Sequence, residues 1–183
     1  MYRIALVGGP GCGKSTQASH FFSILKSNGY KIDQIQEWCR EAINDGKLPY
    51  TPWAQFWIYE EQLKKETCIP DEIDYMVTDS PVFLSYIYAV INSTIEEDNW
   101  LLVKMYEKFL SGIKRYDSIF ICKRENKYVL DGTRRQSEEH AIEIDNMIIN
   151  MLDYHKVQYT VLSGTVQERT EIMCKEIGID LNG

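Results

Sequence analysis

The 183-residue sequence has no long apolar run, few prolines and no clustered cysteines. No stretch approaches membrane-spanning length, and the start MYRIALVGG turns polar too soon for a signal peptide. The five cysteines, an odd number without a C-x-x-C pair, argue against a disulfide framework and a zinc knuckle. We therefore expect a protein of the reducing cytoplasm, with no membrane partner.

Positive charge is also scarce, because 20 Lys and Arg stand against 27 Asp and Glu, for a net charge of -7. The electrostatic field of a protein with this negative net charge repels phosphate backbones, so a nucleic-acid partner remains possible but is disfavoured. Any anion that the protein binds must be captured by a local site. The length fits a single domain over residues 1–183.

Short apolar segments alternate with longer amphipathic ones, which is typical of βαβ units and a parallel sheet. An Asn28-Gly29 pair predicts the end of the first helix, and Ser80 as N-cap with Pro81 predicts the start of another. The predicted strands are 2–8, 31–36, 73–79, 117–122 and 157–163. The predicted helices are 14–27, 37–45, 52–68, 81–91, 95–112, 136–155 and 165–177.

The stretch GGPGCGKSTQ follows the first predicted strand and opens the first helix, and it contains the pattern G-x-x-x-x-G-K-[ST]. Its glycines let backbone N–H groups wrap a phosphate, Lys14 reaches the outer phosphates and Ser15 can ligate Mg²⁺. We predict ATP and Mg²⁺ as cofactors and an α/β fold, a P-loop NTPase three-layer sandwich with a five-stranded, mainly parallel sheet flanked by helices. The expected nucleotide contacts are Gly8, Gly9, Pro10, Gly11, Cys12, Gly13, Lys14, Ser15 and Thr16.

Two carboxylates end predicted strands, where open α/β sheets place their ligand crevice. Asp79 closes the apolar run IDYMVTD and could hold Mg²⁺ with Ser15 or orient an acceptor hydroxyl. Glu37 ends the second strand and could act as a general base. A helix cap for Asp79 and a solvated helix start for Glu37 are the alternatives, and the sequence does not decide which carboxylate is the base.

The segments EWCREA, EEQ, VTDSP and YVLDGTRR together resemble a family of small P-loop kinases that includes the bacterial nicotinamide riboside kinase domain. The matching positions are Glu37 with Arg40, Gln62, Asp79 and the lid motif 131–134 that ends in Arg134. The resemblance implies phosphate transfer from ATP to a nucleoside-like acceptor, with Arg134 neutralising charge on the phosphoryl group.

The charged segment at about residues 123–136 carries a turn signal at Asp131-Gly132, which predicts a mobile surface loop or a lid, with Arg124 as a second candidate lid arginine. A solvated basic loop is the alternative for these arginines. Thymidylate-kinase-like proteins place arginine after the strand-terminal Asp, whereas Ser80 follows Asp79 here, which weakens a monophosphate acceptor. The chain shows no attached nucleotidyltransferase domain, so a fused role in NAD synthesis is not expected.

Aromatic residues could hold the acceptor ring. The stretch TPWAQFWIYEEQ places Trp53 and Trp57 on one helix face, and Gln62 could hydrogen-bond the edge of a ring stacked on Trp57. Trp38, beside Glu37, is a comparable candidate. The alternative is that the aromatic stripe belongs to the core.

The sequence therefore predicts a Mg²⁺/ATP kinase of a nucleoside-like or nucleotide-like small molecule, with Lys14, Glu37, Asp79 and Arg134 as catalytic residues. The substrate-binding residues are Trp38, Arg40, Trp57, Gln62 and Arg124. Two alternatives stay open, a phage-type kinase of a hydroxymethylated base within DNA and a regulatory P-loop NTPase module. The acceptor and the oligomeric state are not determined.

Overall fold

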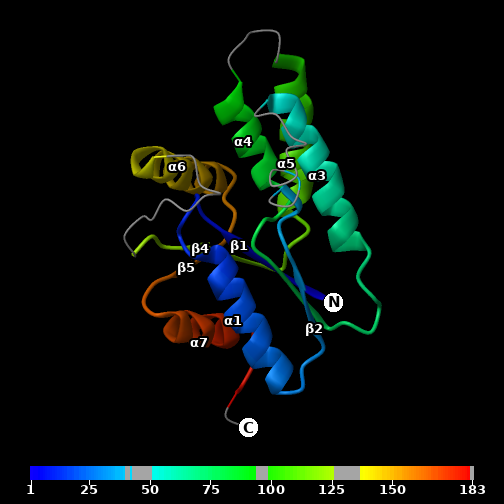
Figure 1. Ribbon diagram of the computed structural model, residues 1–183, viewed down its shortest axis with the longest axis vertical. Helices are drawn as coiled ribbons and strands as arrows, with labels where there is room; N and C mark the ends of the chain where they lie inside the picture. The colour runs from blue at the N-terminus through cyan, green and yellow to red at the C-terminus, as the bar shows by residue number, and fades with distance from the viewer. Residues whose placement is uncertain (40–41, 43–50, 94–98, 126–136, 182–183) are drawn as a thin grey trace.

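Five parallel strands form one sheet in the order β2-β3-β1-β4-β5 (Figure 1). This is a computed structural model that describes residues 1–39, 42, 51–93, 99–125 and 137–181. The strands are β1 Tyr2–Val7, β2 Ile32–Ile35, β3 Tyr75–Thr78, β4 Ser118–Cys122 and β5 Thr160–Leu162. The helices are α1 Lys14–Ser27, α3 Pro52–Thr67, α4 Leu84–Asn92, α5 Asn99–Ile113, α6 Glu138–Tyr154 and α7 Val166–Glu176.

The strand β1 contributes side chains to two hydrophobic cores, one on each face of the sheet. Successive side chains of a strand point to opposite faces. Ala5 and Val7 accordingly pack with residues of α3 to α6, whereas Ile4 and Leu6 pack with α1 and α7. Figure 1 shows α1 beside α7, with α3, α4 and α5 gathered at the other end of the molecule. Helices thus cover both faces, and the predicted three-layer α/β sandwich is confirmed.

The register of the sheet brings the carboxyl ends of three strands to one edge. Thr78 of β3 pairs with Ala5 of β1 and with Ile35 of β2. The residues that follow these strands, including Gly8, Glu37 and Asp79, therefore emerge at the same edge of the sheet. This edge positions the candidate site.

The predicted bounds hold for α1, which ends at Asn28 with Gly29 in the left-handed region at φ 83°. The predicted start of α4 is wrong, because its N-cap is Phe83 and not Ser80. The backbone N–H of Ser80 donates instead to Thr78 Oγ1 at 3.2 Å, and Pro81 opens a turn in which Leu84 N–H donates to its carbonyl. The predicted helix 37–45 lies largely outside the described residues.

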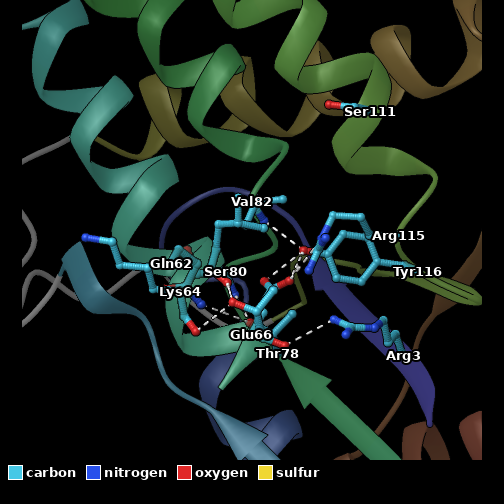
Figure 2. A network of polar contacts seen from close by, with 12 residues as sticks. Arg3, Gln62, Lys64, Glu66, Thr78, Ser80, Val82, Ser111, Arg115 and Tyr116 are labelled. Carbon is cyan, nitrogen blue, oxygen red and sulfur yellow. Dashed lines mark hydrogen bonds and ion pairs between the residues drawn. The ribbon is translucent and has the colours of Figure 1, made fainter. Parts of the chain in front are cut away.

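A buried polar network holds the turn that follows Asp79 (Figure 2). The hydroxyl of Tyr116 accepts from the Val82 N–H at 2.9 Å and donates to the carboxylate of Glu66, at 2.8 and 2.9 Å from its two oxygens. Glu66 belongs to α3 and is fully buried. Burial raises the pKa of Glu66 to about 7, against the opposing effects of Tyr116, Arg115 and Arg3. The network therefore ties α3 to the β3–α4 turn.

Among the described residues, no helix is both long and apolar enough to cross a membrane.

Candidate nucleotide-binding and acceptor site

The phosphate loop, residues 8–15, has the backbone that its glycines make possible. Gly8, Gly11 and Gly13 have φ values of 143°, 77° and 89°. A Cβ at Gly8 would lie 2.6 Å from the sulfur of Cys12. Cys12 is buried, so it fills space beneath the loop, and the close packing at Gly8 requires a residue without a side chain.

Lys14 folds back over this loop. Its Nζ donates to the carbonyl oxygens of Gly8 at 2.7 Å and Gly9 at 2.9 Å. Burial works to lower the pKa of Lys14, but the nearby Cys12, Tyr88 and Glu37 raise it above its ordinary value. The ammonium group therefore stays charged and lies within electrostatic reach of Glu37.

Asp79 has the environment of a cation ligand. The residue is 6% exposed, and its buried Oδ1 has no hydrogen-bond partner among the described residues. A buried carboxylate oxygen is costly unless something pairs with it. Ser15 lies half-buried in the first turn of α1. A carboxylate and a hydroxyl beside bound phosphates are the donors that Mg²⁺ takes, so these two residues fit that ion.

Tyr88 of α4, which we did not predict from the sequence, is half-buried and packs against the hydrophobic core, and the charges of Lys14 and Glu37 act on it. Burial raises the pKa of Tyr88, Lys14 lowers it, and Glu37 and Cys12 raise it further. The phenol thus stays protonated and can donate a hydrogen bond beside Glu37, which is half-buried just beyond the end of β2. The signal in the sequence was weak, because Tyr88 occurs within the apolar helix LSYIYAVIN and looks like a core residue.

Gln62 has a structural role that the sequence did not indicate. Its Oε1 accepts from the backbone N–H of Trp38 at 3.0 Å, and its Nε2 donates to Thr78 Oγ1 at 3.4 Å. Gln62 is 1% exposed. Both ends of the amide are used within the protein, so the geometry opposes the predicted contact between Gln62 and an acceptor. The half-buried Trp38 remains a predicted contact.

Trp57 and Gln62 do not line one slot. Five positions along a helix separate two side chains by about 140°, and Trp57 is 57% exposed whereas Gln62 faces the core. Trp53 is 47% exposed, with its ring centroid 5.4 Å from that of Trp100. The i, i+4 spacing of the two tryptophans was recognised correctly, but it marks the solvent side of α3. The predicted pairing of Trp57 with Gln62 is therefore wrong.

The beginning of the predicted lid is held at the phosphate loop. Arg124 donates from Nε and Nη2 to Asp145 Oδ2 at 3.0 and 2.9 Å. The other oxygen of Asp145 accepts from the backbone N–H of Gly9 at 2.5 Å. Arg124 thus lies at the phosphate loop through Asp145, which was not predicted, and its role in a lid stays a prediction.

A second buried arginine anchors the same segment from α7. Arg169 is 5% exposed and donates from Nη2 to the carbonyl of Lys123 at 2.8 Å and to Glu125 at 3.2 Å. Its Nε donates to the Gly164 carbonyl at 3.0 Å. Residues 123–125 are therefore held between α6 and α7.

The remaining predicted residues lie at the rim or beyond the described structure. Pro10 is half-buried and Thr16 is exposed at the first turn of α1. Arg40, Arg134 and the rest of the motif 131–134 fall outside the described residues, so their roles stay predictions.

The parallel sheet and the phosphate loop together define a P-loop NTPase fold. The model of a family described as an AAA domain, AAA_28, matches residues 3–169, and the chain belongs to this family. A search of curated proteins finds no match.

Solved structures agree on the fold. A NadR protein in complex with NR is similar with a TM-score of 0.80 at 16% identity, over 100% of this chain and 53% of that chain. A NadR protein with NAD and AMP-PNP is similar at 0.75 and 13% identity, over 98% of this chain and 50% of the other. The chain therefore spans about half the length of these NadR structures.

A deoxyadenosine kinase from M. mycoides, with the products dCMP and dCDP, is similar over nearly its whole length. The TM-score is 0.57 at 16% identity, with 96% of this chain and 98% of that chain covered. At these identities the likeness is one of fold. The expected resemblance to small P-loop nucleoside and nucleotide kinases is thereby confirmed.

Proposed function

We propose that the protein transfers the γ-phosphate of ATP to a hydroxyl group of a small nucleoside-like acceptor in the cytoplasm. One observation carries the proposal: Glu37 follows β2 at the same edge of the sheet from which Asp79 and the phosphate loop with Lys14 emerge. A carboxylate at this position can accept the proton of an acceptor hydroxyl, which is the role that a transfer enzyme gives to a general base.

On the donor side, the backbone of residues 8–15 would hold the β-phosphate, and Lys14 would stabilise charge on the transferring phosphoryl group. Ser15 and the buried Asp79 would hold Mg²⁺, which neutralises phosphate charge when bound. Arg124 is already placed at the loop, and we propose that Arg134 reaches the phosphates from the lid.

On the acceptor side, we propose that Glu37 takes the proton of the attacking hydroxyl, because Asp79 is assigned to the metal. The protonated Tyr88 would donate a hydrogen bond to the acceptor. Arg40 and Trp38 complete the proposed set.

The acceptor class is supported by the ligands of structures with this fold. A NadR protein is in complex with NR, and the deoxyadenosine kinase holds deoxynucleotide products. These are small molecules with a ring and a sugar. The net charge of -7 opposes a DNA acceptor, which requires a basic groove.

The test is ATP turnover by the purified protein with Mg²⁺ and a panel of acceptors. The panel contains nucleosides, nucleotides, nicotinamide riboside and duplex DNA with hydroxymethylated bases. We expect ADP formation to rise with one class of free nucleoside-like acceptor. Stimulation by the DNA alone, lost as salt is raised, would favour the DNA-base kinase, and turnover that ignores every acceptor would favour a regulatory NTPase.

A further inference from the structure

Asp145 joins two parts of the site that are far apart in the sequence. Its Oδ1 accepts from the N–H of Gly9, 136 positions away. Its Oδ2 accepts from Nε and Nη2 of Arg124, 21 positions away. The side chains of Arg124 and Asp145 are 11% and 20% exposed, so this is a mostly buried, charge-assisted contact.

The packing around Gly9 leaves room only for this arrangement. A Cβ at Gly9 would lie 2.5 Å from the carbonyl oxygen of Ala141, 2.9 Å from Asp145 Oδ1 and 3.3 Å from Arg124 Nη2. The first turns of α6 and the guanidinium group therefore lie directly against the backbone of the phosphate loop. A side chain at position 9 would push both of them away.

The negative charge of Asp145 affects how an anionic ligand binds at the phosphate loop. A carboxylate beside the phosphate loop repels a triphosphate unless a cation neutralises it. Arg124 supplies that cation, and the same bonds hold its guanidinium group at the loop. The next residue, Glu125, accepts from the Gly164 N–H at 2.7 Å and from Arg169, so the chain on the far side of Arg124 is also fixed.

We propose that Asp145 is a positioning residue for nucleotide binding, which holds the Gly9 peptide in its phosphate-binding conformation and presents Arg124 to the triphosphate. The inference rests on the proposed function insofar as the bound nucleotide is ATP. It concerns the donor side alone and needs no knowledge of the acceptor.

The test is calorimetric titration of Mg-ATP into purified variants. Asp145→Asn keeps an oxygen that can accept from Gly9 but loses the charge that holds Arg124, whereas Asp145→Ala loses both contacts. We expect the dissociation constant of ATP to rise by about tenfold in Asp145→Asn, the size of one charge-assisted hydrogen bond, and further in Asp145→Ala. The matched control is Asp153→Asn on the same helix, whose carboxylate accepts from the Tyr159 hydroxyl at the surface.

A double-mutant cycle separates positioning from simple destabilisation. Arg124→Gln alone leaves the Asp145 charge uncompensated at the loop, so it should weaken ATP binding more than the pair Arg124→Gln with Asp145→Asn. If the substitutions only destabilise the fold and Asp145 has no positioning role, the double variant should instead bind ATP more weakly than either single variant. Thermal unfolding without nucleotide confirms that each protein is folded, and Asp145→Asn serves where Asp145→Ala does not fold.

An ATP affinity equal to or higher than that of the wild type, in a folded Asp145→Asn or Asp145→Ala variant, overturns the inference and leaves the proposed function standing. A wild-type protein that binds no ATP overturns both.

Discussion

The Nζ of Lys14 lies 2.7 Å from the carbonyl oxygen of Gly8, so the lysine side chain is folded back over the phosphate loop. In the proposed role of Lys14, nucleotide binding exchanges this contact for one to phosphate, and the surroundings of the lysine raise its pKa and so keep it charged. We therefore expect Lys14→Ala to lower kcat by roughly 100-fold to 1000-fold, as for loss of one group that stabilises the transition state.

Steady-state ADP formation measures the Lys14→Ala effect, with circular dichroism as the control for folding. Retention of more than a tenth of the wild-type kcat would contradict the assignment of Lys14.

Glu37 and Tyr88 should act on the acceptor side only. Glu37→Gln removes the proposed base, and we expect kcat to fall by about 100-fold or more while the dissociation constant of ATP changes little.

Tyr88→Phe removes one hydrogen bond and should raise the KM of the acceptor more than that of ATP. The measurements are acceptor and ATP titrations of each variant. A Glu37→Gln protein with wild-type kcat would rule out Glu37 as the base.

Gln62 should matter for stability, because its amide joins Trp38 to Thr78. Gln62→Ala leaves a partly buried N–H and a buried hydroxyl without this partner, so the free energy of unfolding should fall by about 1 to 3 kcal/mol. Urea unfolding measures this change. The comparison variant is Trp57→Ala on the solvent face of the same helix, which should change neither the stability nor the acceptor KM appreciably. A large rise in acceptor KM for Trp57→Ala would restore the stacking role.

Glu66 should make stability depend on pH. Its pKa rises from 4.5 to about 7 on folding, so between these values the folded state binds more protons than the unfolded state. Stability is then greatest below pH 4.5 as far as this group is concerned, and it falls by up to about 3 kcal/mol as pH rises to 7. Glu66→Gln removes this slope.

Urea unfolding at pH 5 and pH 8 tests the Glu66 prediction. The control is Glu60→Gln on the same helix, which breaks a partly exposed pair with Lys108 and should leave the slope in place. An unchanged slope in Glu66→Gln would show that other groups cause it.

The phosphate loop and the strand ends could be predicted because their signals are local. A glycine pattern between a strand and a helix specifies its own backbone, and Asp79 follows an apolar run that only a buried strand explains. The same locality placed Asn28 at the end of α1. These features are determined by neighbouring residues in the sequence, so they can be predicted without knowledge of tertiary contacts.

The rest of the site depends on contacts between distant segments. Asp145 is one acid among several on α6, and only its contact with Gly9 distinguishes it. Tyr88 packs against the hydrophobic core, and only the effects of Lys14 and Glu37 on its pKa connect it with the site. The predicted contact of Gln62 with an acceptor is wrong for the same reason. Its hydrogen bonds to Trp38 and Thr78 form only when the chain folds, so the sequence does not reveal them.

The central claim is that the phosphate goes to a small acceptor, and mass spectrometry of the reaction products tests it most directly. Wild-type protein, Mg-ATP and the acceptor that stimulates turnover should yield ADP and phosphorylated acceptor in equal amounts. Glu37→Gln should yield little of either. Release of ADP with inorganic phosphate, and no phosphorylated acceptor from any member of the panel, would contradict the account.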